Sequence, residues 1–187
     1  MHPEELALTP VPASSLRDDR WFETLFREHY PRVVGLLTRL TGDPAQSEEI
    51  AADAFSKLSR HPLPFGGQCD LAAWVYRVAS NAGLDALRAG TRRRRKEEAA
   101  GAERLRTEAE PHALEMLLRE ERARRVRTVL SALKPRDAQL LLLRTSGLSY
   151  REIAQALGMA ASSVGTTLVR AEREFERRYR ARYGDDV

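Results

Sequence analysis

The sequence predicts an all-α protein built from two small helical domains that a partly helical linker joins. Charged residues make up 31% of the 187 residues and aromatic residues only 6%, a balance typical of helices with solvated faces. Apolar residues recur three and four positions apart over most of the chain, which is the period of helices that bury one face. Eight of the twelve aromatic residues lie between Trp21 and Tyr76, and this concentration indicates a compact amino-terminal core.

The first predicted helices follow from these spacings and from the proline and glycine residues between them. Apolar residues from Trp21 to Leu40 have helical spacing, and Pro31 is expected in the first turn of a renewed helix. After a turn at residues 42–44, a second helix is expected over Ala45–Ser59, with its acidic and basic residues on the outer face.

The helices farther along the chain are marked in the same way. Residues 61–70 form a loop rich in proline and glycine, and a longer helix then starts near Leu71 and runs into the basic cluster Arg92–Lys96. In the carboxyl-terminal part, Lys134 and Pro135 are expected to end one helix before the next begins.

The chain is predicted to divide into four parts. These are a flexible arm (residues 1–19), an amino-terminal domain (residues 20–96), an acidic linker (residues 97–113) and a carboxyl-terminal domain (residues 114–187). Residues 122–187 hold 14 Lys and Arg against 7 Asp and Glu, a basic block that suits contact with nucleic-acid phosphates. Charge alone would also fit a solvated helix.

Residues 147–175 carry the most specific local signal, that of a helix-turn-helix. Ser149 and Glu152 have the spacing of a capping box at the start of a short helix. Gly158 suits the end of that helix, and Ser162 is the expected N-cap of the next one. The second helix places four apolar residues on one inward stripe: Val164, Leu168, Ala171 and Phe175.

The face opposite that stripe is the expected DNA-reading surface. Its small residues allow close approach to DNA, and Arg170 is placed to reach a guanine edge or a phosphate. A helical hairpin with a solvated basic face and no nucleic-acid partner is the alternative interpretation. The candidate contacts to duplex DNA are Tyr150, Arg151, Ser162, Ser163, Gly165, Thr166, Thr167, Val169, Arg170 and Arg173, with Arg177 as a further phosphate contact.

A second polar surface is expected on the helix that begins near Leu71. Arg77, Asn81, Asp85 and Arg88 follow one another at spacings of four, four and three, so they form one stripe on that helix. With aromatic residues nearby, amide and guanidinium groups of this kind hold unstacked bases in proteins that bind single strands. A stripe that is merely solvated has the same spacing, so both interpretations stay open.

At these residues the chain resembles the extracytoplasmic-function (ECF) group of the sigma-70 family, which keeps only the conserved regions 2 and 4. The resemblance in region 2 includes F-x-x-L-F-R-E-H-Y-P-R-V from Phe22, L-T-G-D-P-A-Q-S-E-E-I-A from Leu40 and A-W-V-Y-R-V-A-S-N from Ala73. In region 4 it includes L-K-P-R from Leu133, G-L-S-Y-R-E-I-A-Q-A-L-G and S-S-V-G-T-T-L-V-R-A. Several ordered blocks are more specific than one helix-turn-helix.

The resemblance implies a cytoplasmic factor that binds core RNA polymerase, recognises promoter DNA as duplex and as melted single strand, and directs transcription initiation. Region 2 would bind the clamp helices of the largest polymerase subunit through Glu48, Glu49, Asp53 and Lys57. The helix with Ser162–Arg173 would read the minus-35 element, and an anti-sigma factor would be a further partner. Recognition and melting of the minus-10 element would fall to Phe65, Trp74, Arg77, Asn81, Asp85 and Arg88.

The sequence departs from the family pattern in two places. Ser162-Ser163-Val164 stands where the family commonly has G-T-V, and the often basic next position is Gly165, so the promoter sequence cannot be carried over. In the second helix, residues 51–54 are smaller than those often found there, which predicts weaker or differently tuned polymerase binding.

Other function classes lack their signatures in this sequence. The four histidines are scattered, Cys69 is the only cysteine, and neither a phosphate-binding loop nor a nucleophile motif is present, so we predict no enzyme activity, metal or cofactor. No run approaches the roughly 18 apolar residues of a membrane span, and we expect no membrane insertion. A duplex-binding helix-turn-helix regulator and a degenerate sigma-like protein that does not initiate transcription remain alternatives.

Overall fold

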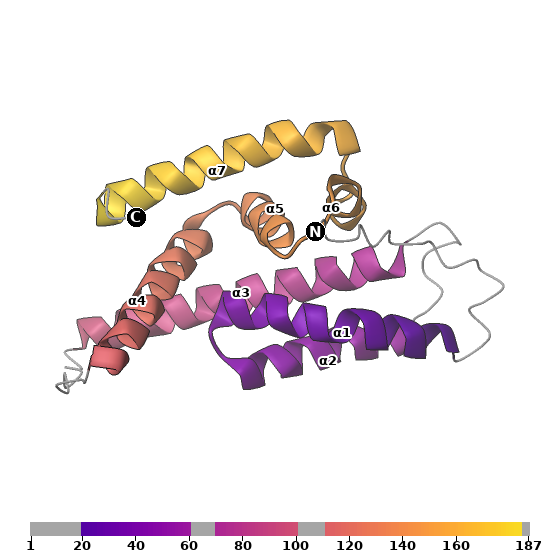
Figure 1. Ribbon diagram of the computed structural model, residues 1–187, viewed down its shortest axis with the longest axis horizontal. Coiled ribbons are helices and arrows are strands. Elements are labelled where there is room, and N and C mark those ends of the chain that lie inside the picture. The colour runs from indigo at the N-terminus through magenta and orange to yellow at the C-terminus, as the bar shows by residue number, and fades with distance from the viewer. Residues whose placement is uncertain (1–19, 61–69, 101–110, 185–187) are drawn as a thin grey trace.

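A computed structural model describes residues 20–60, 70–100 and 111–184. The described residues form seven helices and contain no strand, which confirms the all-α prediction (Figure 1). The predicted arm, the loop at residues 61–69 with Phe65, and most of the predicted linker lie outside the described residues.

Three helices form the amino-terminal group: α1 (Arg20–Thr41), α2 (Pro44–Arg60) and α3 (Leu71–Ala99). They pack side by side along their lengths, and α2 buries the apolar face predicted from its spacing (Figure 1). Their core includes large side chains that are at most 1% exposed, among them Val33, Leu36, Leu37, Leu40, Phe55, Leu58 and Val75.

Pro31 does not start a new helix, contrary to the sequence prediction. It lies inside α1, which continues from Arg20 to Thr41. A proline inside a helix removes one backbone hydrogen bond and usually bends or breaks the helix. Here the buried residues on both sides of Pro31, such as Leu25 and Val33, pack against α2 and α3, and this burial keeps the two halves in one helix.

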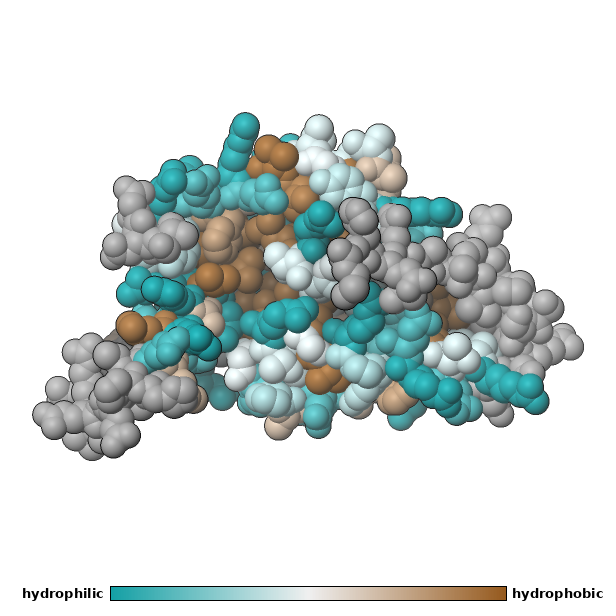
Figure 2. Space-filling view, viewed as in Figure 1, coloured by the Kyte–Doolittle hydropathy of each residue, from teal (hydrophilic) through white to brown (hydrophobic). Residues whose placement is uncertain are grey.

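Four helices form the carboxyl-terminal group: α4 (Pro111–Ala132), α5 (Pro135–Thr145), α6 (Tyr150–Leu157) and α7 (Ala161–Tyr183). Pro135 occupies the first turn of α5, so the predicted helix boundary at Lys134 is confirmed. In the view of Figure 2, hydrophilic side chains cover the lower helices, and apolar side chains gather between α7 and α5.

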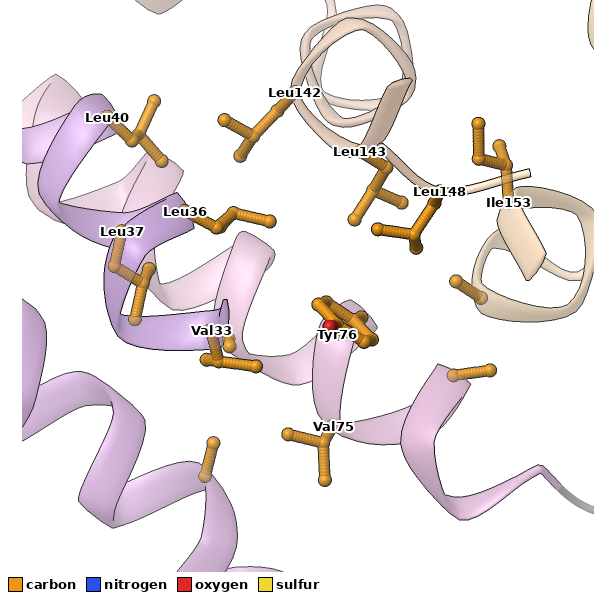
Figure 3. Close-up of a cluster of buried hydrophobic side chains, with 14 of the residues drawn as sticks. Val33, Leu36, Leu37, Leu40, Val75, Tyr76, Leu142, Leu143, Leu148 and Ile153 are labelled. Atoms are coloured by element: carbon orange, nitrogen blue, oxygen red, sulfur yellow. The ribbon is translucent and has the colours of Figure 1, made fainter. Parts of the chain in front are cut away.

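The two groups share one continuous hydrophobic core. Helices α5 and α6 lie on α3, and α5 also touches α1. Tyr76 of α3 is 2% exposed and lies beside Leu143 and Leu148, while Leu36 of α1 points toward Leu142 (Figure 3). Burial of this apolar surface holds the groups together in the described arrangement.

The carboxyl end of α4 joins the groups through arginine side chains. Arg88 of α3 donates from Nε to the carbonyl of Ser131 and from Nη2 to the carbonyl of Leu133, both at 3.4 Å. Arg178 of α7 donates to the carbonyl of Ala132 at 2.5 Å. Because the last carbonyls of a helix lack intrahelical partners and carry partial negative charge, guanidinium groups stabilise this end.

A buried histidine lies near the contact between the groups. His29 is 5% exposed, and its ring meets the Tyr76 ring edge-on with 5.9 Å between centroids. Burial lowers the pKa of His29 below its ordinary value of 6.5. The charged groups that act on it are Glu28, Arg32, Asp70 and Glu152.

We predict that the close approach of α1 to α3 tolerates no side chain at Gly83. A Cβ atom there would lie 2.6 Å from Leu37 Cδ2 and 2.9 Å from Leu40 Cδ2, whereas a Cβ at Gly90 of the same helix would meet nothing within 4 Å. Replacing either glycine by alanine gains the same helix propensity, so the difference between the variants isolates packing. Gly83→Ala should be less stable than Gly90→Ala by about 1–3 kcal/mol in urea unfolding. Equal stabilisation of both would contradict this packing.

The buried His29 predicts a pH dependence of stability. Since its folded-state pKa is lowered, the unfolded chain takes up the proton more readily as the pH falls below 6.5. The free energy of unfolding should therefore decrease from about pH 7 to pH 5, and His29→Phe should flatten this decrease. The raised pKa of Asp70, which burial causes, acts in the opposite sense at lower pH. Parallel curves for wild type and variant would show that His29 does not cause the dependence.

Candidate nucleic-acid interface

The helix-turn-helix has the local geometry that its sequence predicts. The Glu152 backbone N–H donates to Ser149 Oγ at 3.3 Å, and the Ser149 N–H donates to Glu152 Oε2 at 2.5 Å, which completes the capping box. Gly158 ends α6 with φ 59° and ψ 50°, the left-handed conformation that glycine adopts without steric strain. These two features fix where α6 starts and where the chain turns into α7.

The start of α7 differs from the prediction. Ala160, not Ser162, is the N-cap, and no side chain caps the helix. After the left-handed Gly158 the chain is already helical at Ala161, so Ser162 and Ser163 lie exposed within the first turn. This turn contains no acidic residue. The Ser163 N–H donates to the Ala160 carbonyl at 2.9 Å. The positive end of the helix dipole, which the N–H groups before it carry, is open to an anion such as a DNA phosphate.

The two faces of α7 are divided as the spacing predicts. Val164, Leu168 and Ala171 are buried against α5 and α6, and Phe175 is half-buried. On the opposite face the candidate DNA contacts Thr166, Val169, Arg170 and Arg173 are exposed, and Gly165 and Thr167 are half-buried.

The arginines of α7 fall into two classes. Arg177 and Arg178 both bond Glu174, at 2.8 Å and 2.6 Å, and these hydrogen bonds lower the pKa of Glu174 to about 2. Within the described residues, Arg170 and Arg173 have no ion pair. The arginines nearer the amino end of α7 are therefore available to a ligand, while Arg177 is already engaged.

The structure adds Arg144 to the residues found from sequence. Tyr150 is 43% exposed, and the Arg144 guanidinium lies 5.4 Å from the centre of its ring. Gly165 stands against the same ring, because a Cβ at Gly165 would lie 3.4 Å from Tyr150 Cε2. Spacing could not reveal Arg144, since it belongs to α5 and meets Tyr150 only after the chain turns. Arg151, beside Tyr150, is exposed.

The polar stripe predicted on α3 is only partly open. Arg77, Asn81 and Asp85 are exposed, and Arg88 and the neighbouring Trp74 are half-buried. Gln139 of α5 donates from Nε2 to Asn81 Oδ1 at 2.7 Å and to Ser80 Oγ at 3.2 Å. With Arg88 bonded to the end of α4, two of the stripe's four residues hold the carboxyl-terminal group in place.

The outer face of α2 is exposed as predicted. Glu48, Glu49, Asp53 and Lys57 all lie on it, and Lys57 Nζ is 2.7 Å from Asp53 Oδ2. In the described parts of the chain, no group of three His, Cys, Asp or Glu side chains is arranged to hold a metal ion. None of the described helices combines the length and apolarity that crossing a membrane requires.

Comparison with known sequences assigns both groups of helices. The sequence model of Sigma-70 region 2 matches residues 25–93, and that of Sigma-70, region 4 matches residues 123–175. The first range spans most of α1 to α3, and the second contains the helix-turn-helix.

Full-length relatives agree with this assignment. RNA polymerase sigma factor YlaC of Bacillus subtilis is 29% identical, over 83% of this chain and 90% of that protein. CarQ of Myxococcus xanthus, also an RNA polymerase sigma factor, is 30% identical over 83% of this chain and 86% of that protein. ECF RNA polymerase sigma factor SigE of Mycolicibacterium smegmatis is 28% identical over 89% of this chain and 64% of that protein.

A solved structure supports the fold alone. The sigma factor RpoE of Bartonella quintana, determined in complex with the anti-sigma factor NepR, has a TM-score of 0.50 and 16% identity. The match covers 84% of this chain and 96% of that one. With both conserved regions matched in order and relatives aligned over most of the chain, the protein belongs to the extracytoplasmic-function group of the sigma-70 family of RNA polymerase sigma factors.

Proposed function

We propose that this protein binds core RNA polymerase in the cytoplasm, recognises two promoter elements and directs transcription initiation. The observation that supports this most directly is the pair of polar surfaces on separate helices of one chain. One is the exposed face of α7 with Arg170 and Arg173, and the other is the stripe on α3 with Asn81. A factor that reads duplex DNA and also holds a melted strand needs two such surfaces.

In this proposal α7 reads the minus-35 element in the major groove. Its uncapped first turn, with Ser162 and Ser163, faces a backbone phosphate, and Arg170 reaches a base edge. Tyr150, Arg151 and Arg144 on the preceding helices contact flanking phosphates and fix the register of the helix on DNA.

The minus-10 element is assigned to the stripe on α3. Asn81 would hold an unstacked base through its amide, with Arg77 and Arg88 near the phosphates and Trp74 beside them. In the described arrangement Asn81 is bonded to Gln139 of α5, and Arg88 to the end of α4. We therefore assign this arrangement to a resting form in which these hydrogen bonds to the carboxyl-terminal group must break before Asn81 and Arg88 can hold the strand.

The polymerase surface is assigned to the outer face of α2. Glu48, Glu49, Asp53 and Lys57 are exposed there and would bind the clamp helices of the largest subunit. An anti-sigma factor is proposed as a further partner, since the structurally similar RpoE was determined with one. The polymerase itself performs the chemistry of RNA synthesis.

Run-off transcription separates this function from its alternatives. Core polymerase would be tested with and without the protein on fragments of the source genome, and discrete new start sites should appear only with it. DNA binding without initiation by an active core would instead favour a helix-turn-helix regulator or a degenerate sigma-like protein.

For the minus-35 surface, we predict that Arg170→Ala weakens promoter binding by roughly 1–3 kcal/mol and relaxes the preference at one base pair. The matched control is Arg177→Ala, because Arg177 is already bonded to Glu174 on the same helix. Binding to a set of single-base promoter variants measures both effects. Uniform weakening across all variants would make Arg170 a phosphate contact.

For the minus-10 surface, we predict that Asn81→Ala impairs promoter opening while duplex binding persists. Gln139→Ala is the matched control, because it removes the same 2.7 Å hydrogen bond but leaves the Asn81 amide in place. Permanganate reactivity of unpaired thymines would measure opening by polymerase with each variant. Opening that falls equally in both variants would mean that the hydrogen bond, and not a base pocket, is what matters.

A further inference from the structure

A groove rich in arginine lies where the two groups of helices meet away from the helix-turn-helix. It has a volume of about 230 Å³ and is lined from α3, α4 and the end of α7. A smaller hollow of about 90 Å³ adjoins it and shares Thr91, Arg94, Arg124 and Thr128 with it. Both are lined by α3 from region 2 and by α4 from the carboxyl-terminal group, so they exist only while these groups are packed together.

The charges around the groove are strongly unbalanced. In the described part of the chain one carboxylate, Glu121, lines the groove, and it is occupied because Oε1 is 3.2 Å from Arg125 Nε and Oε2 contacts Arg124. Among the described residues, the remaining arginines have no carboxylate partner. The five arginines that line the groove are Arg94, Arg95, Arg124, Arg125 and Arg182.

The end of α7 concentrates this charge further. Two guanidinium groups lie near the Tyr183 ring, with Arg125 5.3 Å and Arg182 5.6 Å from its centre. Earlier in the carboxyl-terminal half of α7, Arg177, Arg178 and Arg180 bond glutamates of the same helix, as Arg180 does with Glu176 at 2.8 Å. Arginines paired with glutamates are thus followed by unpaired positive charge where α7 meets the groove.

Gathered guanidinium groups repel one another, and a multivalent anion between them removes this repulsion. Planar guanidinium forks match phosphate oxygens in pairs, and the hydroxyl groups of Thr91, Thr128 and Tyr183 add polar lining. Pockets for organic ligands commonly enclose roughly 300–1,000 Å³. At about 230 Å³ the arginine-lined groove is smaller than these pockets, and it is therefore suited to a compact chain of phosphates.

We propose that a compact polyphosphate group binds in this groove and bridges α3 to α4 and α7. Such a ligand favours the arrangement in which Gln139 is bonded to Asn81, so it opposes the release of the minus-10 surface. The consequence for promoter opening rests on the proposed function, but binding at the groove does not. The protein alone, without polymerase, is therefore sufficient for the test.

The test measures sodium tripolyphosphate binding to the full chain by calorimetry and by thermal unfolding, against sodium chloride of equal ionic strength. Because the ligand binds the folded arrangement, it should raise Tm beyond the sodium chloride control. Arg94→Gln combined with Arg124→Gln removes one lining charge from each group and should weaken binding by about tenfold or more. The control pair, Arg93→Gln with Arg122→Gln, removes the same charge from exposed neighbours on the same helices and should bind as wild type.

Two outcomes would overturn the proposal. Equal weakening in both pairs would show attraction to general surface charge, with no site at the groove. A single-stranded oligodeoxynucleotide provides the second comparison. If its binding depends on the lining pair while tripolyphosphate does not bind, the groove takes phosphates of nucleic acid and not a compact anion. Calorimetry and thermal unfolding do not depend on transcription. The groove and the proposed function are therefore tested separately.

Discussion

The packing of α5 and α6 onto α3 is the constraint on which the rest of this structure depends. Helix α3 packs against α1 and α2 of its own group and against α4, α5 and α6 of the carboxyl-terminal group. Its Tyr76 lies among Leu36, Leu143 and Leu148, so one buried side chain packs against residues of both groups in the shared core. The polar stripe with Asn81 continues along the same helix, and residues needed for DNA therefore border residues needed for stability.

The interactions across this contact differ in whether water or a ligand can replace them. A hydrogen bond such as Gln139 to Asn81 contributes only about 0.5–1.5 kcal/mol net, because water or a base can replace either partner. Apolar burial around Tyr76 has no such substitute in water, at about 25 cal/mol per Å². The carboxyl-terminal group can thus leave α3 only when another surface covers its apolar residues. Polymerase supplies a surface of that kind in the proposed function.

Local chemistry explains which parts of the fold could be predicted from sequence. Ser149, Glu152 and Gly158 act within one turn of the chain, and their predicted roles at the ends of α6 are confirmed. Pro31 and Ser162 were wrongly interpreted because packing of α1 and the turn after Gly158 override the local preference of each residue. The bond between Gln139 and Asn81 was not predictable, since helical spacing shows that a face is polar but not what meets it.

Arginines with and without an ion pair occupy different parts of α7. Glutamates three or four positions away occupy Arg177, Arg178 and Arg180, and this pairing limits their attraction for anions. Glu174 lies four positions after Arg170 and Glu176 three positions after Arg173, but these glutamates bond the later arginines. Among the described residues, Arg170 and Arg173 toward the recognition end therefore have no ion pair, and neither has Arg182 at the other end. Positive charge is therefore concentrated at two separate places, one facing the solvent beside the helix-turn-helix and one closing the groove against α3. The two ends can respond to different anions because the paired segment between them isolates one from the other.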